Sequence, residues 1–477
     1  MSDASGRSTE RVHAFLGEHP SIRRGLAVGI VNDAALARRV HGEAGGGLSV
    51  EAIAVALRRE ERVARAERAA GPAFPQLVGG ATLQLLPDYA LLRLRDEEAV
   101  WSRLAELRGV LQRGRRPATS MVYVEEGEPR ISVLCPGPLV ARMRRVVPPR
   151  SVVGVARGLA LVVLEADQAA NDTPGVIATL AELLAERGLV PGPLIAAGRR
   201  VSFAAPLEPA RRAFEFLHEL RRGPGPEPTA PDAQTLSPAA PVLPVASDRE
   251  SARSGAEVAR AYIEGHPSVA DCLAYGVVNF TALARQIASE TGHTNPEAIE
   301  AALRRSRAAH GRSETVEHRL LAVIRASRID LRTRVALVSA PHSFTAISRI
   351  LESDAARSAD RRQLFQILQG PTSVTVLCDE ELVASVLRTI GPRSSITATY
   401  DLSAVIVRSP PAIVETPGVL AYLSLALARA GLNCVELMSV QLESTFVVTQ
   451  RDALEVFRVL SGLVHPPEAA PPPPAAP

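Results

Sequence analysis

The chain contains two copies of one long unit. The run His266-Pro267-Ser268 repeats His19-Pro20-Ser21, and further matches follow over more than two hundred residues. The offset between matching residues is 247 at these histidines and 243 at Cys135 and Cys378. Because this offset drifts so little, each copy should be the same multi-element unit, far longer than a solenoid repeat. A duplicated chain can place side by side what other proteins assemble as a homodimer, so we expect function where the copies, or their subunits, meet.

The composition is that of a globular protein and excludes several kinds of catalysis. Of the 477 residues, 46% are hydrophobic and 22% are charged. The sequence contains no lysine, so all 54 basic residues are arginine. Schiff-base lysines, the Walker lysine and the ATP-binding lysine of kinases are therefore excluded, because a guanidinium cannot replace an amine nucleophile. A net charge of +3 is too close to neutral to indicate nucleic-acid binding by itself.

Cysteine usage and hydropathy predict a cytoplasmic protein without a membrane segment. Four cysteines are widely scattered and form no CxxC pair or Cys/His cluster, which is typical of buried free thiols in a reducing compartment. Residues 1–11 are polar, and no stretch reaches the roughly 18 uninterrupted apolar residues of a membrane span.

Changes in composition divide the chain into two heads, two larger segments, a linker and a tail. Proline-rich residues 223–254 should act as an extended spacer, because they cannot bury enough apolar surface to fold. The predicted segments are a helical head at 10–70, two sheet-containing units at 80–222, the linker at 223–254, a second head at 255–327, two further units at 328–464 and a disordered Pro/Ala tail at 465–477.

Each head reads as a set of short helices. The predicted helices span residues 34–40 and 51–68 in the first copy, and 256–264, 269–275, 280–291 and a helix from Asn295 in the second. Asn295-Pro296 predicts an N-cap followed by proline at the first helical position, and Gly292 predicts the C-cap before it. Asn32 and Asn279 look like N-caps or turn residues. Two such helices joined by a short glycine-bearing connection have the outline of a helix-turn-helix.

After each head the pattern changes to alternating strands and helices. In the second copy the predicted order is strand 329–339, helix 343–352, strands 363–369 and 373–378, helix 379–389 and strand 396–400. A shorter pass follows with strand 402–407, helix 416–430, strands 432–440 and 444–449 and helix 452–463. The first copy matches, with a helix at 97–112 and strands at 151–154 and 159–164 among its elements. The fold class predicted is α+β, two tandem copies of a helical head followed by ferredoxin-like βαββαβ units.

The run from Glu415 to Ala421, followed by a helix and then Gly431-Leu432-Asn433, resembles the ACT domain. This small ligand-sensing module of amino-acid-regulated enzymes carries a Pro-Gly-Val-Leu-Ala loop and a Gly-[Ile/Leu]-Asn turn. The whole repeat is also similar to an archaeal family of uncharacterised ACT-containing proteins in which a His-Pro-Ser helical head precedes the ACT unit. The resemblance implies a regulatory protein whose effector lies between two modules.

The loop itself makes sense as a receptor for an anion and an amine. Gly418 allows close approach of the backbone, and free N–H groups at the start of the next helix favour a carboxylate. Glu415 or Asn433 could take an amino group. The candidate ligand-binding residues are Glu415, Thr416, Pro417, Gly418, Val419, Leu420 and Asn433 in the second copy, and Asp172, Thr173, Pro174, Gly175 and Val176 in the first.

Two observations weaken this interpretation. Thr-Pro-Gly before a helix is also an ordinary N-cap with proline at the first position. The first copy departs from the pattern, because Val190 replaces the asparagine and Pro191-Gly192-Pro193 interrupts the following strand. If only one copy binds a ligand, the second copy is favoured.

DNA binding is an alternative function for the heads. Arginines would lie on or just beyond the recognition helix, where they can reach phosphates and guanine edges. The candidates are Arg58, Arg59 and Arg62 in the first copy and Arg304, Arg305 and Arg307 in the second. Glu60, Glu61 and Glu300 interleave with them, and such a mixed-charge run is more typical of a solvated helix face.

The sequence offers no sign of an enzyme, a metal site or a cofactor. His19 and His266 occupy equivalent places but have no second histidine or carboxylate at ligand spacing, so a cap near Ser21 or Ser268 is favoured over a metal role. No GxSxG, HExxH, GxGxxG or Walker motif is present.

We therefore expect a non-catalytic regulatory protein that binds a small effector, with an amino acid as the leading candidate, at interfaces between ACT-like units. The alternatives are a transcriptional regulator that binds DNA through its heads and a protein-interaction scaffold with vestigial sites. The duplication is compatible with an intramolecular pseudo-dimer or with a homo-oligomer.

Overall fold

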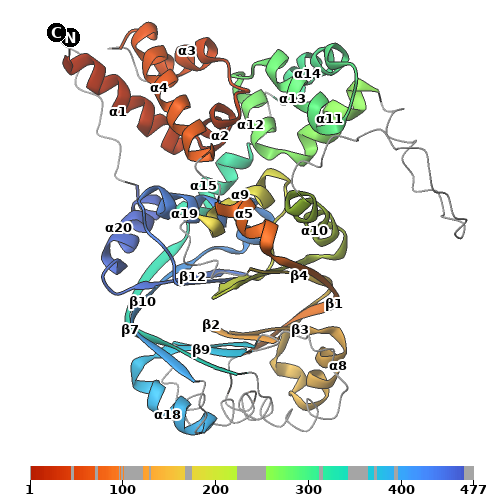
Figure 1. The fold of residues 1–477 in the computed structure, drawn as a ribbon, viewed down its shortest axis with the longest axis vertical. Helices are drawn as coiled ribbons and strands as arrows, with labels where there is room; N and C mark the ends of the chain where they lie inside the picture. Colours follow the sequence, from red (N-terminus) through yellow and green to blue (C-terminus); the bar gives the residue numbers. More distant parts are fainter. Residues whose placement is uncertain are drawn as a thin grey trace, which may run out of the picture.

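The computed structural model describes residues 2–43, 48–69, 73–95, 97, 100, 122–127, 130–166, 175–222, 254–310, 315–341, 364–369, 373–391 and 396–466. These residues form three levels, which Figure 1 shows from top to bottom: a pair of helical heads, a sheet layer covered by helices, and a second sheet layer with helices below it. The fold mixes helices and strands, as the sequence predicts.

The heads are two equivalent bundles that pack against each other. The first consists of α1 (Ser2–Glu18), α2 (Pro20–Val28), α3 (Asp33–Glu43) and α4 (Val50–Ala69), and the second of α11 (Gly255–Gly265), α12 (Pro267–Tyr275), α13 (Phe280–Thr291) and α14 (Pro296–His310). Asn32 N–H donates to Val277 O at 2.6 Å, and Asn279 N–H donates to Ile30 O at 2.7 Å, so the contact has an approximate two-fold symmetry. One continuous apolar core spans both bundles.

The helix boundaries follow the capping residues. Asn32 and Asn279 accept hydrogen bonds from the N–H groups of Ala35 and Ala282 at 3.0 and 3.1 Å, so both are N-caps. Asn295 caps α14 through Ala298 N–H at 3.0 Å. Gly292 ends α13 with a φ of 68°, a left-handed conformation that glycine adopts without a Cβ penalty. These predicted caps are confirmed.

In the part of the chain that the structure describes, twelve strands from both copies form one closed ring. Their order is β1-β3-β2-β8-β9-β7-β10-β12-β11-β5-β6-β4. The strands are β1 (Thr82–Arg95), β2 (Val122–Gly127), β3 (Arg130–Pro136), β4 (Val152–Glu165), β5 (Leu194–Ala197), β6 (Arg200–Pro206), β7 (Arg328–Pro341), β8 (Phe365–Gln369), β9 (Ser373–Asp379), β10 (Thr397–Arg408), β11 (Glu436–Val440) and β12 (Glu443–Thr449). The copies join at two antiparallel pairings, β2 with β8 and β5 with β11.

The ring corrects the prediction of separate ferredoxin-like units. The predicted strands 151–154 and 159–164 are parts of the single strand β4, and 396–400 and 402–407 are parts of β10. Gly158 and Asp401 have φ values of 71° and 57°, and the pairing register of β10 with β7 shifts between Thr399 and Leu402. Such a bulge bends a strand without ending it, so each long strand continues from one sheet layer into the other.

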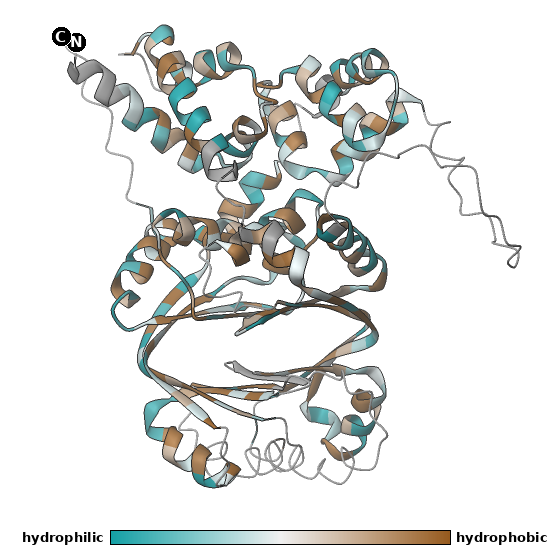
Figure 2. Ribbon diagram, in the orientation of Figure 1, coloured by the Kyte–Doolittle hydropathy of each residue, from teal (hydrophilic) through white to brown (hydrophobic). Residues whose placement is uncertain are grey.

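Helices cover the outer face of the ring. In the upper layer these are α5 (Ala73–Gly80), α9 (Val176–Glu186), α10 (Leu207–Arg222), α15 (Val316–Arg325), α19 (Val419–Arg429) and α20 (Ala453–Val464); in the lower layer they are α8 (Gly137–Val146) and α18 (Glu380–Ile390). Short 3₁₀ turns span Pro149–Ser151 and Pro411–Glu415. Figure 2 shows hydrophobic residues concentrated where helices face strands. The helices predicted at 97–112 and 343–352 lie outside the described residues, apart from isolated positions in the first.

Candidate functional site

Helices α9 and α19 begin at equivalent glycines. Gly175 and Gly418 have φ values of 82° and 93°, which place both in the left-handed region. Among the described residues, no side chain caps either helix. The first N–H groups of a helix have no partner within the helix, so at these two ends they can donate hydrogen bonds to an anion or another polar acceptor.

Each glycine bend faces the helix of the other copy. A Cβ placed on Gly418 would lie 3.7 Å from Ala185 Cβ on α9 and 3.1 Å from Leu320 Cδ1 on α15. A Cβ on Gly175 would lie 4.0 Å from Ala428 Cβ on α19. The two bends are therefore related by the approximate two-fold axis of the duplication, and Leu320 covers one side of the second bend.

The structure separates two residues that sequence reasoning grouped together. Asn433 lies with Gly175 of the first copy in a cavity of about 20 Å³, where there is room for about one water molecule. Pro417 and Gly418 instead line a much larger cavity on the other side of α19. Asn433 is therefore not positioned beside the glycine bend of its own copy.

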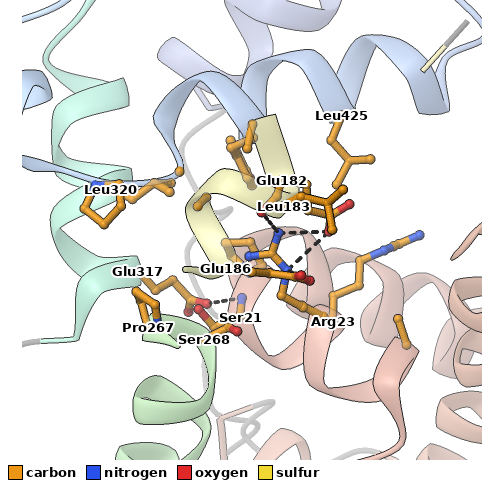
Figure 3. A pocket seen from close by; sticks show the side chains of 18 of the residues that line it. Ser21, Arg23, Glu182, Leu183, Glu186, Pro267, Ser268, Glu317, Leu320 and Leu425 are labelled. Carbon is orange, nitrogen blue, oxygen red and sulfur yellow. Dashed lines mark hydrogen bonds and ion pairs between the residues drawn. The ribbon is translucent and has the colours of Figure 1, made fainter. Parts of the chain in front are cut away.

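The larger cavity has a volume of about 320 Å³ and lies between the heads and the upper helices. Helices α2 and α12 of the two heads supply one side, α9 and α19 supply the other, and α15 lies between them. Figure 3 shows Glu317 pointing toward Ser21 on one side of this space, with Glu182 and Glu186 of α9 opposite. The cavity is thus walled by both copies and by both levels of the molecule.

A buried carboxylate joins three of these elements. Glu317 on α15 is only 2% exposed. Its Oε2 accepts from Ser21 N–H at 2.6 Å, and its Oε1 accepts from the Tyr275 hydroxyl at 2.9 Å. The same Oε1 lies 2.7 Å from Nδ1 of His19. These partners come from the first head and the second head, so one side chain connects both heads to α15.

Asp271 on α12 forms the other half of this polar network. Its Oδ2 accepts from the Ser21 hydroxyl at 2.8 Å and from Glu317 N–H at 2.9 Å, and its Oδ1 accepts from Val316 N–H at 2.8 Å. Asp271 therefore caps the N-terminus of α15 from a neighbouring helix. Burial raises the pKa of Asp271 to about 6, although the hydrogen bonds from Ser21 and from the backbone partly oppose this shift.

An arginine connects the first head to α9. Arg24 on α2 forms ion pairs with Glu182 at 3.0 Å and with Glu186 at 3.1 Å. Its guanidinium also donates to the carbonyl oxygen of Glu182 at 3.3 Å. Because the Arg24 side chain is 18% exposed, these contacts are only partly screened by solvent.

The two copies have diverged at this site. The offset of the repeat is 247 between α2 and α12 and 246 between β1 and β7, so Arg24 is opposite Asp271 and Gly71 is opposite Glu317. His266, the counterpart of His19, stacks on Tyr262 with ring centroids 3.7 Å apart, and its Nδ1 lies 2.8 Å from Tyr262 O. Burial lowers the pKa of His266, which favours its neutral form. The two carboxylates of this network, Asp271 and Glu317, therefore have no acidic counterpart in the first copy, where the matching residues are Arg24 and Gly71.

The other predicted ligand residues take different positions. Glu415 is exposed and lines neither cavity. The Thr416 hydroxyl is buried and donates to Ala412 O at 2.8 Å. Val176, Val419 and Leu420 belong to the apolar core beneath the helices. Asp172, Thr173 and Pro174 lie outside the described residues.

The arginines proposed for DNA are mostly on the surface of the heads. Arg58, Arg59 and Arg62 are exposed on α4, and Arg305 is exposed on α14. Arg304 pairs with Glu300 at 2.6 Å, and its guanidinium lies 4.9 Å from the centre of the Phe280 ring. The side chain of Arg307 lies outside the described residues. DNA binding by the heads stays a prediction.

Sequence reasoning did not identify Asp271, Glu317 or Arg24. Glu317 lies in α15, which has no motif, and its partners are distant in the sequence. A signal was present, however, because Arg24 and Asp271 occupy the same repeat position with opposite charge. A charge reversal at a buried position between two similar copies marks a place where the copies no longer perform the same role.

Within the described residues, no group of three or more His, Cys, Asp or Glu side chains is arranged to hold a metal ion. In the same part of the chain, no helix is both long and apolar enough to cross a membrane.

Comparisons with known proteins give partial structural likenesses. No family model matches the chain, and the comparison with curated proteins returned no match. An aspartate kinase from Synechocystis is similar over 81% of this chain and 56% of its own, with 12% identity and a TM-score of 0.28. The regulatory subunit of aspartate kinase from Thermus thermophilus matches 29% of this chain and 99% of its own, with 13% identity and a TM-score of 0.25. E. coli aspartokinase III in complex with lysine and aspartate matches 29% of this chain and 32% of its own, with 22% identity and a TM-score of 0.21.

Proposed function

We propose that this protein is a non-catalytic regulatory protein that binds a small effector in the cavity between its heads and helices α9 and α19. The observation that carries the proposal is that both copies and both levels of the molecule wall this space of about 320 Å³. A volume of this size accommodates a small metabolite. Its shape depends on how the heads lie on the helices below, so an occupant would favour one arrangement.

The chemistry of the walls favours a molecule with both an acidic and a basic end, such as an amino acid. Gly418 opens α19 beside the cavity without a side-chain cap, which suits a carboxylate. Asp271 and Glu317 line the same cavity and supply negative charge for an ammonium group. Leu320 and Ala421 provide apolar surface for the rest of the molecule.

The acids of the cavity are suited to binding rather than to proton transfer. Asp271 and Glu317 are both held by backbone N–H groups and by neighbouring hydroxyls. Such bonds fix the carboxylates in place. Enzymatic activity would need a further group held ready to react with a substrate, and the proposal assigns none.

Coupling would pass through the contacts that join the heads to the helices below. Arg24 connects α2 to α9, and Glu317 connects α15 to both heads. An effector that binds one arrangement of these elements more tightly than another shifts the population toward that arrangement. The heads, or a partner that contacts them, would then read the state of the cavity.

A thermal-shift panel of the twenty amino acids and common nucleotides tests the proposal on the intact chain. A true effector raises the unfolding midpoint, because it binds only the folded state. Gly418→Ala should abolish the shift by placing a methyl group at the mouth of α19, next to Leu320. Gly292→Ala is the matched control, since Gly292 also has a positive φ but lies in the second head with no atom within 4 Å of its added Cβ. If no compound raises the midpoint, the protein is better described as a scaffold.

A further inference from the structure

The inside of the strand ring is a second environment, separate from the head cavity. Alternate residues of each strand point inward, and the inner apolar cluster contains Met438 and Val440 of β11 and Ile195 of β5. By the same alternation Glu436 of β11 and Ser202 of β6 face the interior. A cavity of about 430 Å³ lies there, between strands of the upper layer and strands β7, β8 and β9 of the lower one.

A row of four residues crosses the upper wall of this cavity. The strand register places Glu436 opposite Ala197, Ala197 opposite Arg200, and Arg200 opposite Glu165. Arg200 forms an ion pair with Glu165 at 2.9 Å, which directs its guanidinium away from Glu436. The row therefore has a paired arginine at one side, a methyl group in the middle and a carboxyl group alone at the other side.

Three polar atoms on this wall are buried without a hydrogen-bond partner among the described residues: Glu436 Oε2, Arg200 Nε and Ser202 Oγ. Glu436 is 7% exposed and Ser202 is 1% exposed. Buried polar atoms nearly always have a partner, because leaving one unpaired costs about 1–3 kcal/mol. An unpaired acceptor, an unpaired donor and an unpaired hydroxyl that all line one cavity point to an occupant that satisfies them together.

We propose that the ring cavity binds a small zwitterion whose ammonium group is held by Glu436 and whose carboxylate is held by Arg200 Nε. Two strand spacings, roughly 10 Å, separate the backbones of these residues. Because the amine and the carboxylate of an α-amino acid are attached to the same carbon, the spacing favours a longer molecule, an ω-amino acid with several methylenes between its charged ends. The Ala197 methyl and the apolar inner wall would contact those methylenes. This site is independent of the effector cavity beneath the heads.

The protonation state of Glu436 gives the proposal a specific signature. Burial raises the pKa of Glu436 to about 8. The other charged groups that line the cavity are Glu165, Arg199 and Arg200; Arg200 is paired with Glu165, and Arg199 donates to Ala166 O at 2.9 Å. The empty site therefore carries a neutral Glu436 at pH 7. Binding of an ammonium group stabilises the ionised carboxylate, so the proton leaves Glu436 for solvent as the ion pair forms.

Isothermal titration calorimetry of the intact chain at pH 7 tests this site with four probes: 5-aminopentanoate, glycine, pentanoate and pentylamine. The expected result is that 5-aminopentanoate binds most tightly, that removal of its amine abolishes binding, and that glycine does not bind. Titration in two buffers with different ionisation enthalpies should show release of close to one proton per molecule bound. Binding without proton release would overturn the proposal. Absence of heat with every probe would also overturn it and would indicate that water fills the cavity.

Four variants test whether binding depends on the ring cavity itself, and not on overall stability or on the effector cavity beneath the heads. Glu436→Gln should weaken 5-aminopentanoate by about 10-fold or more and remove proton release, because a charge-assisted hydrogen bond is lost. Ala197→Leu should block the site by filling the space between Glu436 and Arg200. Glu455→Gln, which removes an exposed carboxylate on α20, is the matched control and should bind as the parent does. Gly418→Ala should also retain binding, so failure of the effector proposal would leave this result unchanged. Equal affinity in Glu436→Gln and the parent would contradict the proposal.

Discussion

His19 Nδ1 lies 2.7 Å from Glu317 Oε1, although 298 residues separate them in the sequence. The His19 ring packs against Phe15 and against the edge of Tyr275, with centroids 4.2 and 5.2 Å away. One buried carboxylate of the second copy thus meets the repeated histidine of the first. The position of the first copy that matches Glu317 is Gly71, so His266 has no matching carboxylate, and its Nδ1 lies 2.8 Å from Tyr262 O.

Loss of the Glu317 carboxylate should destabilise the junction between the heads and α15. Glu317→Gln replaces one of the two carboxylate oxygens with an NH₂ group, which is a donor. This group would face either Ser21 N–H, the partner of Oε2, or Tyr275 and His19, the partners of Oε1. We expect a loss of about 2 kcal/mol in the free energy of unfolding, measured by urea denaturation. Glu415→Gln is the control, because Glu415 is exposed, and it should change stability by less than about 0.5 kcal/mol. Equal stability of the two variants would show that Glu317 contributes nothing net.

The Asp271 carboxyl should make stability depend on pH between about 4 and 6. An unfolded aspartate loses its proton near pH 3.9, whereas burial raises the pKa of Asp271 to about 6 in the folded protein. The folded state binds the proton more tightly in this window, so its contribution to stability falls as pH rises from about 4 to about 6 and is constant above that. The change amounts to roughly 3 kcal/mol.

The comparison of the parent with Asp271→Asn isolates this effect. Asparagine does not titrate, and it should also destabilise the N-terminus of α15 by presenting an NH₂ group to backbone donors. The stability advantage of the parent over the variant should therefore shrink as pH rises from 4 to 6. Denaturation curves at pH 4, 5, 6 and 7 measure it, and a constant difference would refute the assigned direction.

Ionisation of Glu436 should also lower stability as pH rises, but over a higher pH range than for Asp271. Its pKa of about 8 means that the folded protein keeps this proton from about pH 4.5 to pH 8, while the unfolded chain does not. The free energy of unfolding of the parent should therefore decline across this range. Glu436→Gln lacks the titrating carboxyl group and should not show this contribution. The variant should gain stability relative to the parent between pH 7 and pH 8.5, a range in which Asp271 is mostly ionised. Parallel stability curves over that range would contradict the prediction.

The two glycine bends should differ in their tolerance of a side chain. Gly175→Ala and Gly418→Ala both force alanine into a left-handed conformation, which costs about 1–2 kcal/mol. Only Gly418 also meets Leu320, at 3.1 Å from the added Cβ. We expect Gly418→Ala to be less stable than Gly175→Ala by about 1 kcal/mol. Thermal unfolding of both variants measures the difference, and the double variant Gly418→Ala with Leu320→Ala should reduce the steric part of it.

Local signals in the sequence predict most of the elements but not how they combine. Asn279, Asn295 and Gly292 define helix ends through their own side chain or φ angle, so neighbouring residues suffice to predict them. The pairing of β5 with β11 and of β2 with β8 depends on strands from different copies. Alternating hydrophobic residues indicate a strand but do not name its partner.

The candidate site shows the same limit. The bend at Gly418 can be found from its motif, but its neighbours Ala185 and Leu320 come from other elements. Asn433 has the right sequence context yet lies with Gly175, because the two-fold arrangement brings the end of each helix to the start of the other. The charges of Arg24 and Asp271 acquire meaning only when both copies occupy one structure.

The closed strand ring has a consequence for assembly. The ring closes through its long strands, each of which is paired on one side only over part of its length: residues 82–86 of β1 pair only with β4, and residues 328–333 of β7 pair only with β10. Among the described residues, a strand from another chain could therefore extend the sheet only along such single-sided stretches, because the short strands between them are paired on both edges. Contacts elsewhere on the described surface would be made by side chains of helices and turns.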